Sequence, residues 1–301
     1  MLARTRIPLL LLCLGLAVAS AAPAQGATKI GIADQKPEMF EDKRFLSLKM
    51  KFARISVPWD VLRYDFTEEE VDEWLQAARK NRVRPLVTFQ RSRVKSAKTR
   101  PTVDQYRREV KRFREKYPWI NEYSAWNEPN LEDKRRPKLI ASYYKTLRSV
   151  CTGCKVLGSD LVDRKGMVTW VRKFLKYTPG KQRPKYWGLH NYVSANRFST
   201  KDTKALQREI RGARLWLTET GGLVARRNTS TVKIPQGKRH AAKVTGFVLR
   251  TWGRSKEIDR VYLYHWDSSS NKDTWDSAFV GSDGKARPAL GVLKQFLRKK
   301  R

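Results

Sequence analysis

The apolar residues of this chain change repeatedly between a period of two and a period of about 3.6. Eight short apolar runs have the pattern of buried strands, and most are followed by a segment with one apolar helical face. An alternation of strand and helix with short connections favours a parallel sheet covered by helices. The predicted strands are residues 29–33, 52–57, 85–89, 120–126, 155–158, 186–189, 214–217 and 260–264.

Eight such units within 301 residues fit a single closed (β/α)8 barrel, the TIM-barrel architecture of the α/β class, over residues 28–301. An open doubly wound sheet is the alternative. No glycine-rich phosphate loop follows any of the strands, and this favours the barrel. Residues 221–238 form the longest irregular segment and are predicted to be a rim or lid. The helix after the second strand is predicted to begin with a capping box of Thr67 and Glu70, with Phe66 stapled to Val71.

The first 27 residues have the pattern of a secretory signal. Arg4 and Arg6 precede an apolar run at residues 7–18, and small residues follow it. The run is shorter than the ~20 residues that span a bilayer, so cleavage is favoured over an uncleaved anchor. We therefore expect a secreted, extracellular or cell-wall-associated protein without stable membrane insertion.

Two cysteines, Cys151 and Cys154, remain after the signal. A redox-active pair of this spacing usually follows a strand and begins a helix, whereas here a helix comes first and a strand follows. A local disulfide is the favoured interpretation, and an oxidising compartment permits it.

The formal net charge of +35 becomes +33 once Arg4 and Arg6 are removed with the signal. Such an excess predicts attraction to polyanions, which include acidic polysaccharide, cell-wall phosphate, membrane headgroups and nucleic acid. The charges recur on almost every polar helix surface, so a generally basic exterior is favoured over a feature of substrate specificity. No nucleic-acid-binding module is evident, and we expect a monomer without a specific nucleic-acid partner.

The functional side chains of such a barrel lie at the carboxyl ends of its strands. Two of them are glutamates, Glu128 after the fourth strand and Glu219 at the seventh. Two carboxylates that face one small space are what glycoside hydrolysis requires, one as proton donor and one as nucleophile. The residues at the strand ends are Asp34, Arg54, Trp59, Gln90, Asn127, Glu128, His190, Tyr192, Glu219 and Trp266.

Two of these strand ends resemble clan A glycoside hydrolases, the (β/α)8 group that includes the family 5 and family 39 retaining enzymes. The matching motifs are Trp126-Asn127-Glu128-Pro129 on the fourth strand and Leu217-Thr218-Glu219-Thr220-Gly221 on the seventh. The resemblance implies that Glu128 is the acid/base and Glu219 the nucleophile. The exact family is not assigned by these motifs.

The family 5 pattern further implies an arginine on strand two, His-x-Tyr on strand six and a tryptophan on strand eight. Arg54, His190 with Tyr192, and Trp266 stand at these places, whereas Gln90 stands where that family commonly has histidine.

Further roles follow from the chemistry of the side chains. Arg54 and Tyr192 can hold Glu219 ionised through charge-assisted hydrogen bonds, and Asn127 can donate to the sugar hydroxyl beside the reacting carbon. Trp266 offers a face on which a sugar ring can stack, and His190 either binds substrate or orders the acid/base. Trp59 and Asp34 are weaker candidates, since each has an equally plausible structural role.

The sequence thus predicts a secreted retaining glycoside hydrolase that cleaves O-glycosidic bonds of a poly- or oligosaccharide, possible anionic polymers included, by double displacement. Transglycosylation is the close variant. The alternatives are an inactive glycan-binding barrel and a basic cell-wall polyanion binder. No cluster of side chains has metal-ligand spacing, and we expect neither metal nor cofactor.

Overall fold

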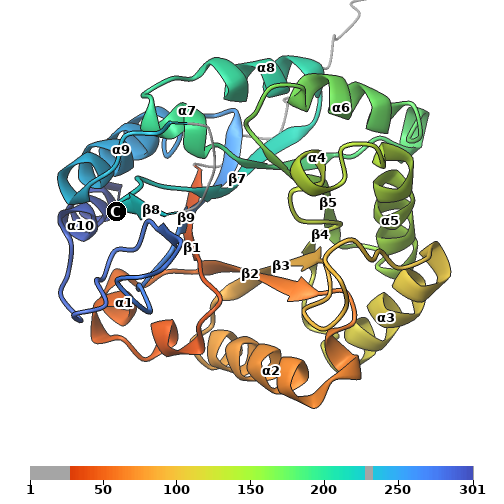
Figure 1. The fold of residues 1–301 in the computed structure, drawn as a ribbon, viewed down its shortest axis with the longest axis horizontal. Coiled ribbons are helices and arrows are strands. Elements are labelled where there is room, and N and C mark those ends of the chain that lie inside the picture. The colour runs from red at the N-terminus through yellow and green to blue at the C-terminus, as the bar shows by residue number, and fades with distance from the viewer. Residues whose placement is uncertain (1–27, 228–232, 301) are drawn as a thin grey trace, which may run out of the picture.

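The computed structural model describes residues 28–227 and 233–300. The predicted secretory segment, residues 1–27, lies outside the described residues. Eight parallel strands form a closed barrel in chain order, and the last of them pairs back with the first (Figure 1). The closed (β/α)8 barrel is therefore confirmed. Its strands are β1 (Lys29–Ala33), β2 (Phe52–Pro58), β3 (Arg84–Gln90), β4 (Glu122–Ser124), β5 (Lys155–Val162), β6 (Tyr186–His190), β7 (Arg214–Thr220) and β9 (Ile258–Tyr264).

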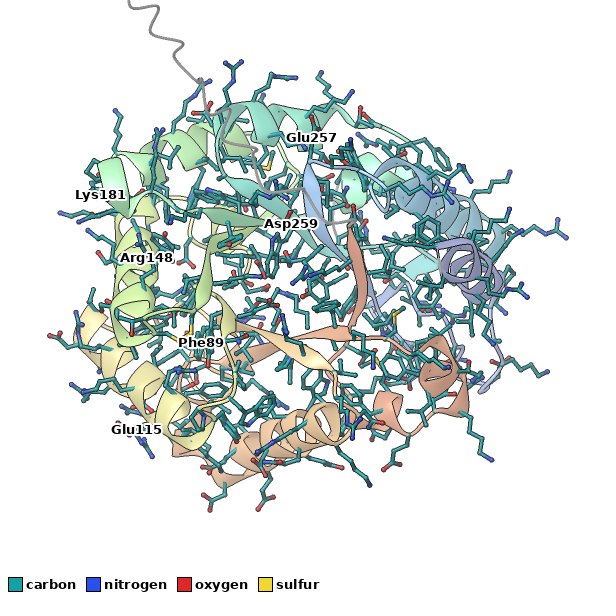
Figure 2. The ribbon with its side chains drawn as sticks, turned by 180° about the vertical axis from the view of Figure 1, so that it is seen from behind. Phe89, Glu115, Arg148, Lys181, Glu257 and Asp259 are labelled. Carbon is teal, nitrogen blue, oxygen red and sulfur yellow. A yellow bond between two sulfur atoms is a disulfide. The ribbon has the colours of Figure 1, made fainter. Side chains whose placement is uncertain are left out.

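Helices surround the barrel, and their apolar faces pack against the outside of the strands. Figure 2 shows the arrangement from behind: the buried Phe89 lies inside the ring, whereas Glu115 and Arg148 point outward from it. None of the helices in the described ranges is long and apolar enough to span a membrane. The longer helices are α2 (Asp65–Lys80), α3 (Val103–Lys116), α5 (Pro137–Val150), α6 (Met167–Leu175), α8 (Lys201–Glu209), α9 (Lys238–Thr251) and α10 (Pro288–Lys300).

Shorter elements lie in the loops between them. A two-stranded antiparallel ribbon pairs β8 with β10 beside the barrel, so that two loops 50 residues apart meet. Arg226, Lys233 and Ile234 from the predicted rim segment line a cavity at this end, and residues 228–232 lie outside the described residues. The short elements are η1 (Pro37–Phe40), α1 (Lys43–Leu48), η2 (Val61–Arg63), α4 (Pro129–Glu132), η3 (Gly180–Gln182), α7 (Tyr192–Asn196), β8 (Ala225–Arg226) and β10 (Trp275–Asp276).

The start of α2 differs from the prediction. The helix begins at Asp65, and the Thr67 hydroxyl donates to the carbonyls of Val61 and Tyr64 instead of capping a helix that starts later. Phe66 is 50% exposed, so it does not form the predicted hydrophobic staple. A hydroxyl in the first turn can bond backward to the preceding carbonyls, and this competes with the capping geometry.

The disulfide between Cys151 and Cys154 is present. It closes the turn between the end of α5 and the start of β5, where Cys151 is buried. The local bridge favoured from the sequence is confirmed.

Candidate active site

Glu128 lies where β4 gives way to α4. The chain continues past β4 between β3 and β5: the amide of Asn127 donates to Phe89 O on β3 at 2.8 Å, and that of Glu128 donates to Asp160 O on β5 at 2.8 Å. Glu128 has φ 46°, in the left-handed region that non-glycine residues rarely occupy. Pro129 follows at the first position of α4, where its fixed φ suits the start of a helix. Backbone strain of this kind is concentrated at functional sites.

Glu219 is held on β7 by two donors. One oxygen accepts from Arg54 Nη1 at 2.6 Å and the other accepts from the Tyr192 hydroxyl at 3.0 Å. A second guanidinium nitrogen of Arg54 donates to the amide oxygen of Asn127 at 2.9 Å. That bond fixes the orientation of the Asn127 amide and leaves its NH2 group for a ligand in the cavity.

Asp160, on β5, is a site residue that the sequence analysis missed. Its carboxylate is fully buried and accepts from Arg54 at 2.7 and 3.1 Å, from the Thr88 hydroxyl at 2.9 Å and from the Ser124 hydroxyl at 2.8 Å. On the neighbouring strand a Cβ at Gly188 would lie 2.0 Å from Asp160 Oδ1, so only glycine leaves room for the carboxylate. Burial would raise the pKa of Asp160, but the Arg54 charge, together with His190 and the Ser124 hydroxyl, outweighs burial and holds this pKa well below its ordinary value.

His190, at the end of β6, connects the two glutamates. Its Nδ1 lies 2.8 Å from Glu128 Oε1 and 3.8 Å from Glu219 Oε2, and its Nε2 lies 3.7 Å from Asp160 Oδ2. Burial alone would lower the pKa of this imidazole, but the Glu219 charge and the interactions with Asp160 and Glu128 outweigh burial and raise it to about 9. His190 is therefore an imidazolium at neutral pH, and it donates to Glu128.

This charge state can be tested by an NMR titration of the three histidines. We expect the His190 signal to titrate near pH 9, whereas burial lowers the pKa of His240 and His265 below the ordinary 6.5, so these two serve as internal controls. Because the folded pKa of His190 exceeds its unfolded value, the charge stabilises the fold fully below pH ~6.5 and stops doing so as pH rises through about 9. A His190 midpoint at or below 6.5 would contradict the network described above.

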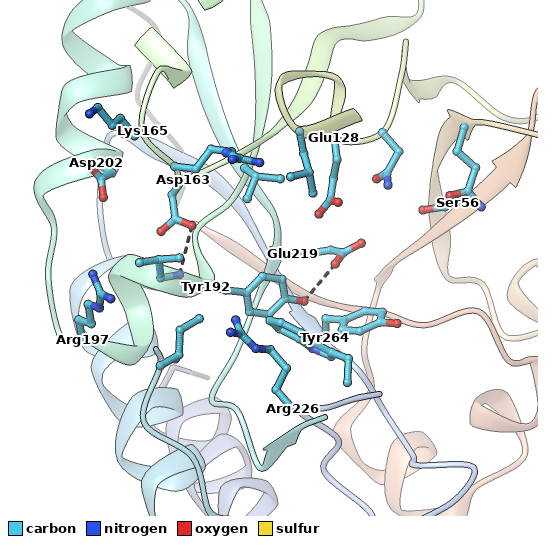
Figure 3. Close-up of a pocket in the computed structure, with 18 of the residues that line it drawn as sticks. Ser56, Glu128, Asp163, Lys165, Tyr192, Arg197, Asp202, Glu219, Arg226 and Tyr264 are labelled. Atoms are coloured by element: carbon cyan, nitrogen blue, oxygen red, sulfur yellow. Dashed lines mark hydrogen bonds between the residues drawn. The ribbon is translucent and has the colours of Figure 1, made fainter. Parts of the chain in front are cut away.

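A cavity of about 1290 Å³ opens over these groups, and both glutamates line it (Figure 3). Their side chains are 24% exposed at Glu128 and 14% at Glu219, so both can meet a ligand. A second cavity, of about 870 Å³, adjoins the first, because Gln35, Ser56 and Gln90 line both. The two cavities together form a cleft that runs past the carboxylates on either side.

The structure brings seven of the predicted residues together at this cleft. Asn127, Glu128, Gln90, Tyr192 and Glu219 line it directly. His190 and Arg54 lie directly beneath, in contact with the glutamates. Together with Asp160 they form a continuous polar network on the axis of the barrel. No group of three or more His, Cys, Asp or Glu side chains in residues 28–227 and 233–300 could hold a metal ion.

Trp266 does not lie at the cavity, contrary to the prediction of a stacking platform. It is 1% exposed, its indole N–H donates to Asp42 at 3.0 Å, and its ring packs edge-on against Phe45. Trp275 on β10 and Tyr264 on β9 line the cavity instead. Trp266 is a core residue, and the aromatic wall of the site comes from a different part of the chain.

Trp59 and Asp34 are also placed in the structural core. Trp59 is 1% exposed and lines neither cavity. Asp34 is 1% exposed, and its carboxylate accepts the backbone amides of Lys36 and Trp266, which fixes the loop after β1. Its neighbour Gln35 lines both cavities, so the prediction for this strand end was one residue too early.

Solved structures share this fold, whereas no protein-family model and no curated protein matches the sequence. A family 39 glycoside hydrolase from Bacteroides cellulosilyticus WH2 superimposes with a TM-score of 0.60 at 13% identity over 90% of this chain, which spans 64% of that protein's length. Xylanase 10B from Thermotoga maritima gives a TM-score of 0.66 at 9% identity, covering 91% of this chain and 96% of that one.

An endo-β-1,4-glucanase from Xanthomonas axonopodis pv. citri gives a TM-score of 0.62 at 12% identity, covering 90% of this chain and 99% of that one. At these identities the likeness shows the fold. The structural neighbours are thus glycoside hydrolases built on the same eight-stranded parallel barrel, in agreement with the resemblance to clan A indicated by the two glutamate motifs.

Proposed function

We propose that the protein is a retaining glycoside hydrolase, with Glu128 as acid/base and Glu219 as nucleophile. The observation that carries the proposal is the shared imidazole: Glu128 Oε1 lies 2.8 Å and Glu219 Oε2 3.8 Å from the same His190 nitrogen. These two oxygens can be no farther apart than the sum of those distances. That limit accommodates the ~5–5.5 Å separation of retaining enzymes and lies at the short end of the ~6.5–9.5 Å range of inverting ones.

In the first step, Glu219 attacks the anomeric carbon while Glu128 transfers its proton to the departing glycosidic oxygen. The carbon–oxygen bond to the leaving sugar breaks, and an ester between Glu219 and the retained sugar forms. In the second step, Glu128 takes a proton from water, whose oxygen displaces Glu219 and restores the starting state. A sugar hydroxyl in place of water would give transglycosylation.

The charges of the site suit this cycle. Arg54 and His190 carry two positive charges, and Glu128, Glu219 and Asp160 can carry three negative ones. A single proton on Glu128 balances the set, which is the state that meets substrate. When Glu219 becomes an ester, Glu128 loses its proton to the leaving group, so the balance is kept in the intermediate, and His190 donates to the newly charged Glu128.

The broader setting is also part of the proposal. Structures with this fold include proteins named for action on xylan and β-1,4-glucan, which supports a poly- or oligosaccharide substrate here. A cleft that extends on both sides of the carboxylates suits a chain cut internally. The apolar run after Arg4 and Arg6 supports export.

The proposal is tested by trapping the intermediate. A panel of 2-deoxy-2-fluoro glycosides with good leaving groups should leave one covalent sugar on the peptide that contains Glu219, detected by mass spectrometry, because the fluorine slows hydrolysis of the ester. The Glu219→Gln variant is the control and should remain unlabelled. Absence of any adduct across sugars that bind the wild-type protein would favour a non-catalytic glycan-binding barrel.

A further inference from the structure

Positive charge gathers on one side of the catalytic pair. Figure 3 shows Lys165, Arg197 and Arg226 on the side of Tyr192, whereas Ser56 lies across the glutamates from them. We call this part of the cavity the basic lobe. Its basic side chains are Arg164, Lys165, Arg197, Arg226 and Lys233.

The basic lobe differs from the neighbouring second cavity in how its cations are paired. Within the described residues, no carboxylate forms an ion pair with Lys165, Arg197, Lys233 or Arg164. Between two of these four residues, the Arg197 guanidinium donates to the backbone carbonyl of Lys233.

The second cavity, on the other side of the glutamates, also contains basic side chains, but carboxylates pair with three of them. Arg93 pairs with Glu70, Arg91 lies 3.9 Å from Glu132, and Lys36 lies 3.0 Å from Asp267. Since the chain is basic throughout, composition alone would give both ends of the cleft the same character. The difference in pairing is what sets the basic lobe apart.

The carboxylates within the basic lobe do not neutralise it. Asp163 accepts the backbone amides of Val193 and Ser194 at the start of α7, and Asp202 accepts the Ser194 hydroxyl. Burial of Asp163 outweighs these hydrogen bonds and raises its pKa to about 7, so it carries only part of a charge near neutrality. Five cations against Asp163 and Asp202 therefore leave the lobe with a net positive field next to the reacting groups, which concentrates anions.

We propose that the basic lobe binds an anionic substituent of the glycan, a carboxylate, sulfate or phosphate ester on a sugar unit close to the cleaved bond. This inference deepens the proposed function and relies on it for the position of the cleaved bond. An anionic unit in the lobe supplies a counter-charge for Lys165, Arg197 and Lys233, whereas a neutral glycan would leave these cations without a carboxylate partner among the described residues. Guanidinium groups pair well with planar carboxylates and with sulfate or phosphate oxygens.

The test separates binding from turnover by working in the Glu219→Gln background. Affinities are measured calorimetrically for glucuronate oligomers and for their methyl esters, in which a methyl group removes the charge of each carboxylate. Cello-oligosaccharides with a sulfate or a phosphate ester are compared with the unmodified oligomers in the same way. At least one anionic probe should bind about tenfold or more tightly than its neutral partner at low salt, and the difference should shrink as salt screens the lobe. The pair of probes that shows this difference in affinity identifies the anionic group that the lobe binds.

A matched pair of variants locates the effect. Arg164→Gln/Lys165→Gln/Arg197→Gln should remove most of the preference, about 10- to 100-fold in affinity for the anionic probe, and leave the neutral probe unaffected. The exposed cations of α3 provide the control, since Arg107→Gln/Arg108→Gln/Lys111→Gln removes the same charge from a helix remote from the cleft and should change neither affinity. Lys165→Gln alone, a change of one exposed side chain, guards against misfolding of the triple variant.

Equal affinity for charged and uncharged partners, or an equal loss in the two triple variants, would overturn the inference. Binding of a single-stranded oligonucleotide that is stronger than that of every anionic glycan, and lost in the basic-lobe variant, would overturn it as well. Wild-type protein that binds an anionic glycan through the lobe without releasing reducing ends would support the inference while contradicting the proposed function.

Discussion

Replacement of Glu219 by glutamine is expected to lower kcat by ~10⁴-fold or more on any glycoside the protein hydrolyses, since the covalent step disappears. Arg54 and Tyr192 hold the two carboxylate oxygens at 2.6 and 3.0 Å. Glutamine keeps the shape: its oxygen can accept from Arg54, and its NH2 group can donate to the Tyr192 hydroxyl oxygen. Arg54 also keeps its bond to the buried Asp160, so the fold should survive. The measurement is initial rates on an aryl glycoside, with circular dichroism and thermal melting as checks on the fold.

The controls distinguish the nucleophile from the acid/base. Glu115→Gln changes an exposed glutamate on α3 and should leave the rate unaltered. Azide added to Glu219→Ala, which opens space for it, should restore turnover and give a glycosyl azide of inverted configuration. Azide added to Glu128→Ala should attack the intermediate instead, with retained configuration, when the leaving group needs no proton. If the two stereochemical outcomes were exchanged, Glu128 would be the nucleophile and Glu219 the acid/base. Undiminished hydrolysis by Glu219→Gln would rule out the double-displacement mechanism.

The order of strands in this barrel was accessible from the sequence because it rests on local periodicity. The predicted runs at residues 29–33 and 186–189 match β1 and β6 to within one residue. Once the strands could be counted, the carboxyl ends of the fourth and seventh placed Glu128 and Glu219 across one opening. Both the strand count and the placement of the two glutamates could therefore be inferred from short segments of the sequence.

Asp160 was missed because it lies inside a strand that was predicted to end too soon. Gly158, Ser159 and Asp160 interrupt the apolar pattern of β5, yet the strand continues to Val162. The apolar Leu161 after them was the available signal that pairing resumes. A carboxylate there is tolerable only because Arg54 reaches it from β2, a contact 106 residues apart in the sequence.

The aromatic wall could not be predicted for a similar reason. Trp266 follows its strand as the clan A pattern requires, but Asp34 and Asp42 bind its backbone and indole N–H groups and turn the ring into the core. Trp275 reaches the cavity through β10, a strand of two residues that exists only because β8 pairs with it. Neither arrangement leaves a local pattern in the sequence.

Replacement of Asp160 by asparagine is expected to lower the free energy of unfolding by about 3–5 kcal/mol, the usual result when one partner of a buried ion pair is removed. Arg54, which is 1% exposed, would keep its charge with Glu219 as its remaining carboxylate. An asparagine NH2 group would also face donors, because Oδ2 accepts from Arg54 and Thr88, and Oδ1 accepts from Ser124. Denaturant unfolding at pH 7 measures the loss.

Asp259→Asn is the matched control, because Asp259 pairs with Arg214 at the partly exposed end of the barrel and its loss should cost at most ~1 kcal/mol. The pH dependence supplies an independent check. Since the folded pKa of Asp160 is depressed, its contribution is complete above pH ~4 and is lost as pH falls further, so the wild-type and Asp160→Asn stabilities should converge only in acid.

The pKa of His190 distinguishes a purely structural role for Asp160 from a role in the active site. Asp160 lies 3.7 Å from His190 Nε2 and helps to raise its pKa to about 9. In the folded fraction of Asp160→Asn, the His190 midpoint should therefore fall, and kcat should fall with it while KM changes little, because Arg54 and His190 position the reacting carboxylates. If the midpoint stayed near 9 and kcat were unchanged, Asp160 would serve the fold alone, and the network beneath the two glutamates would end at Arg54 and His190.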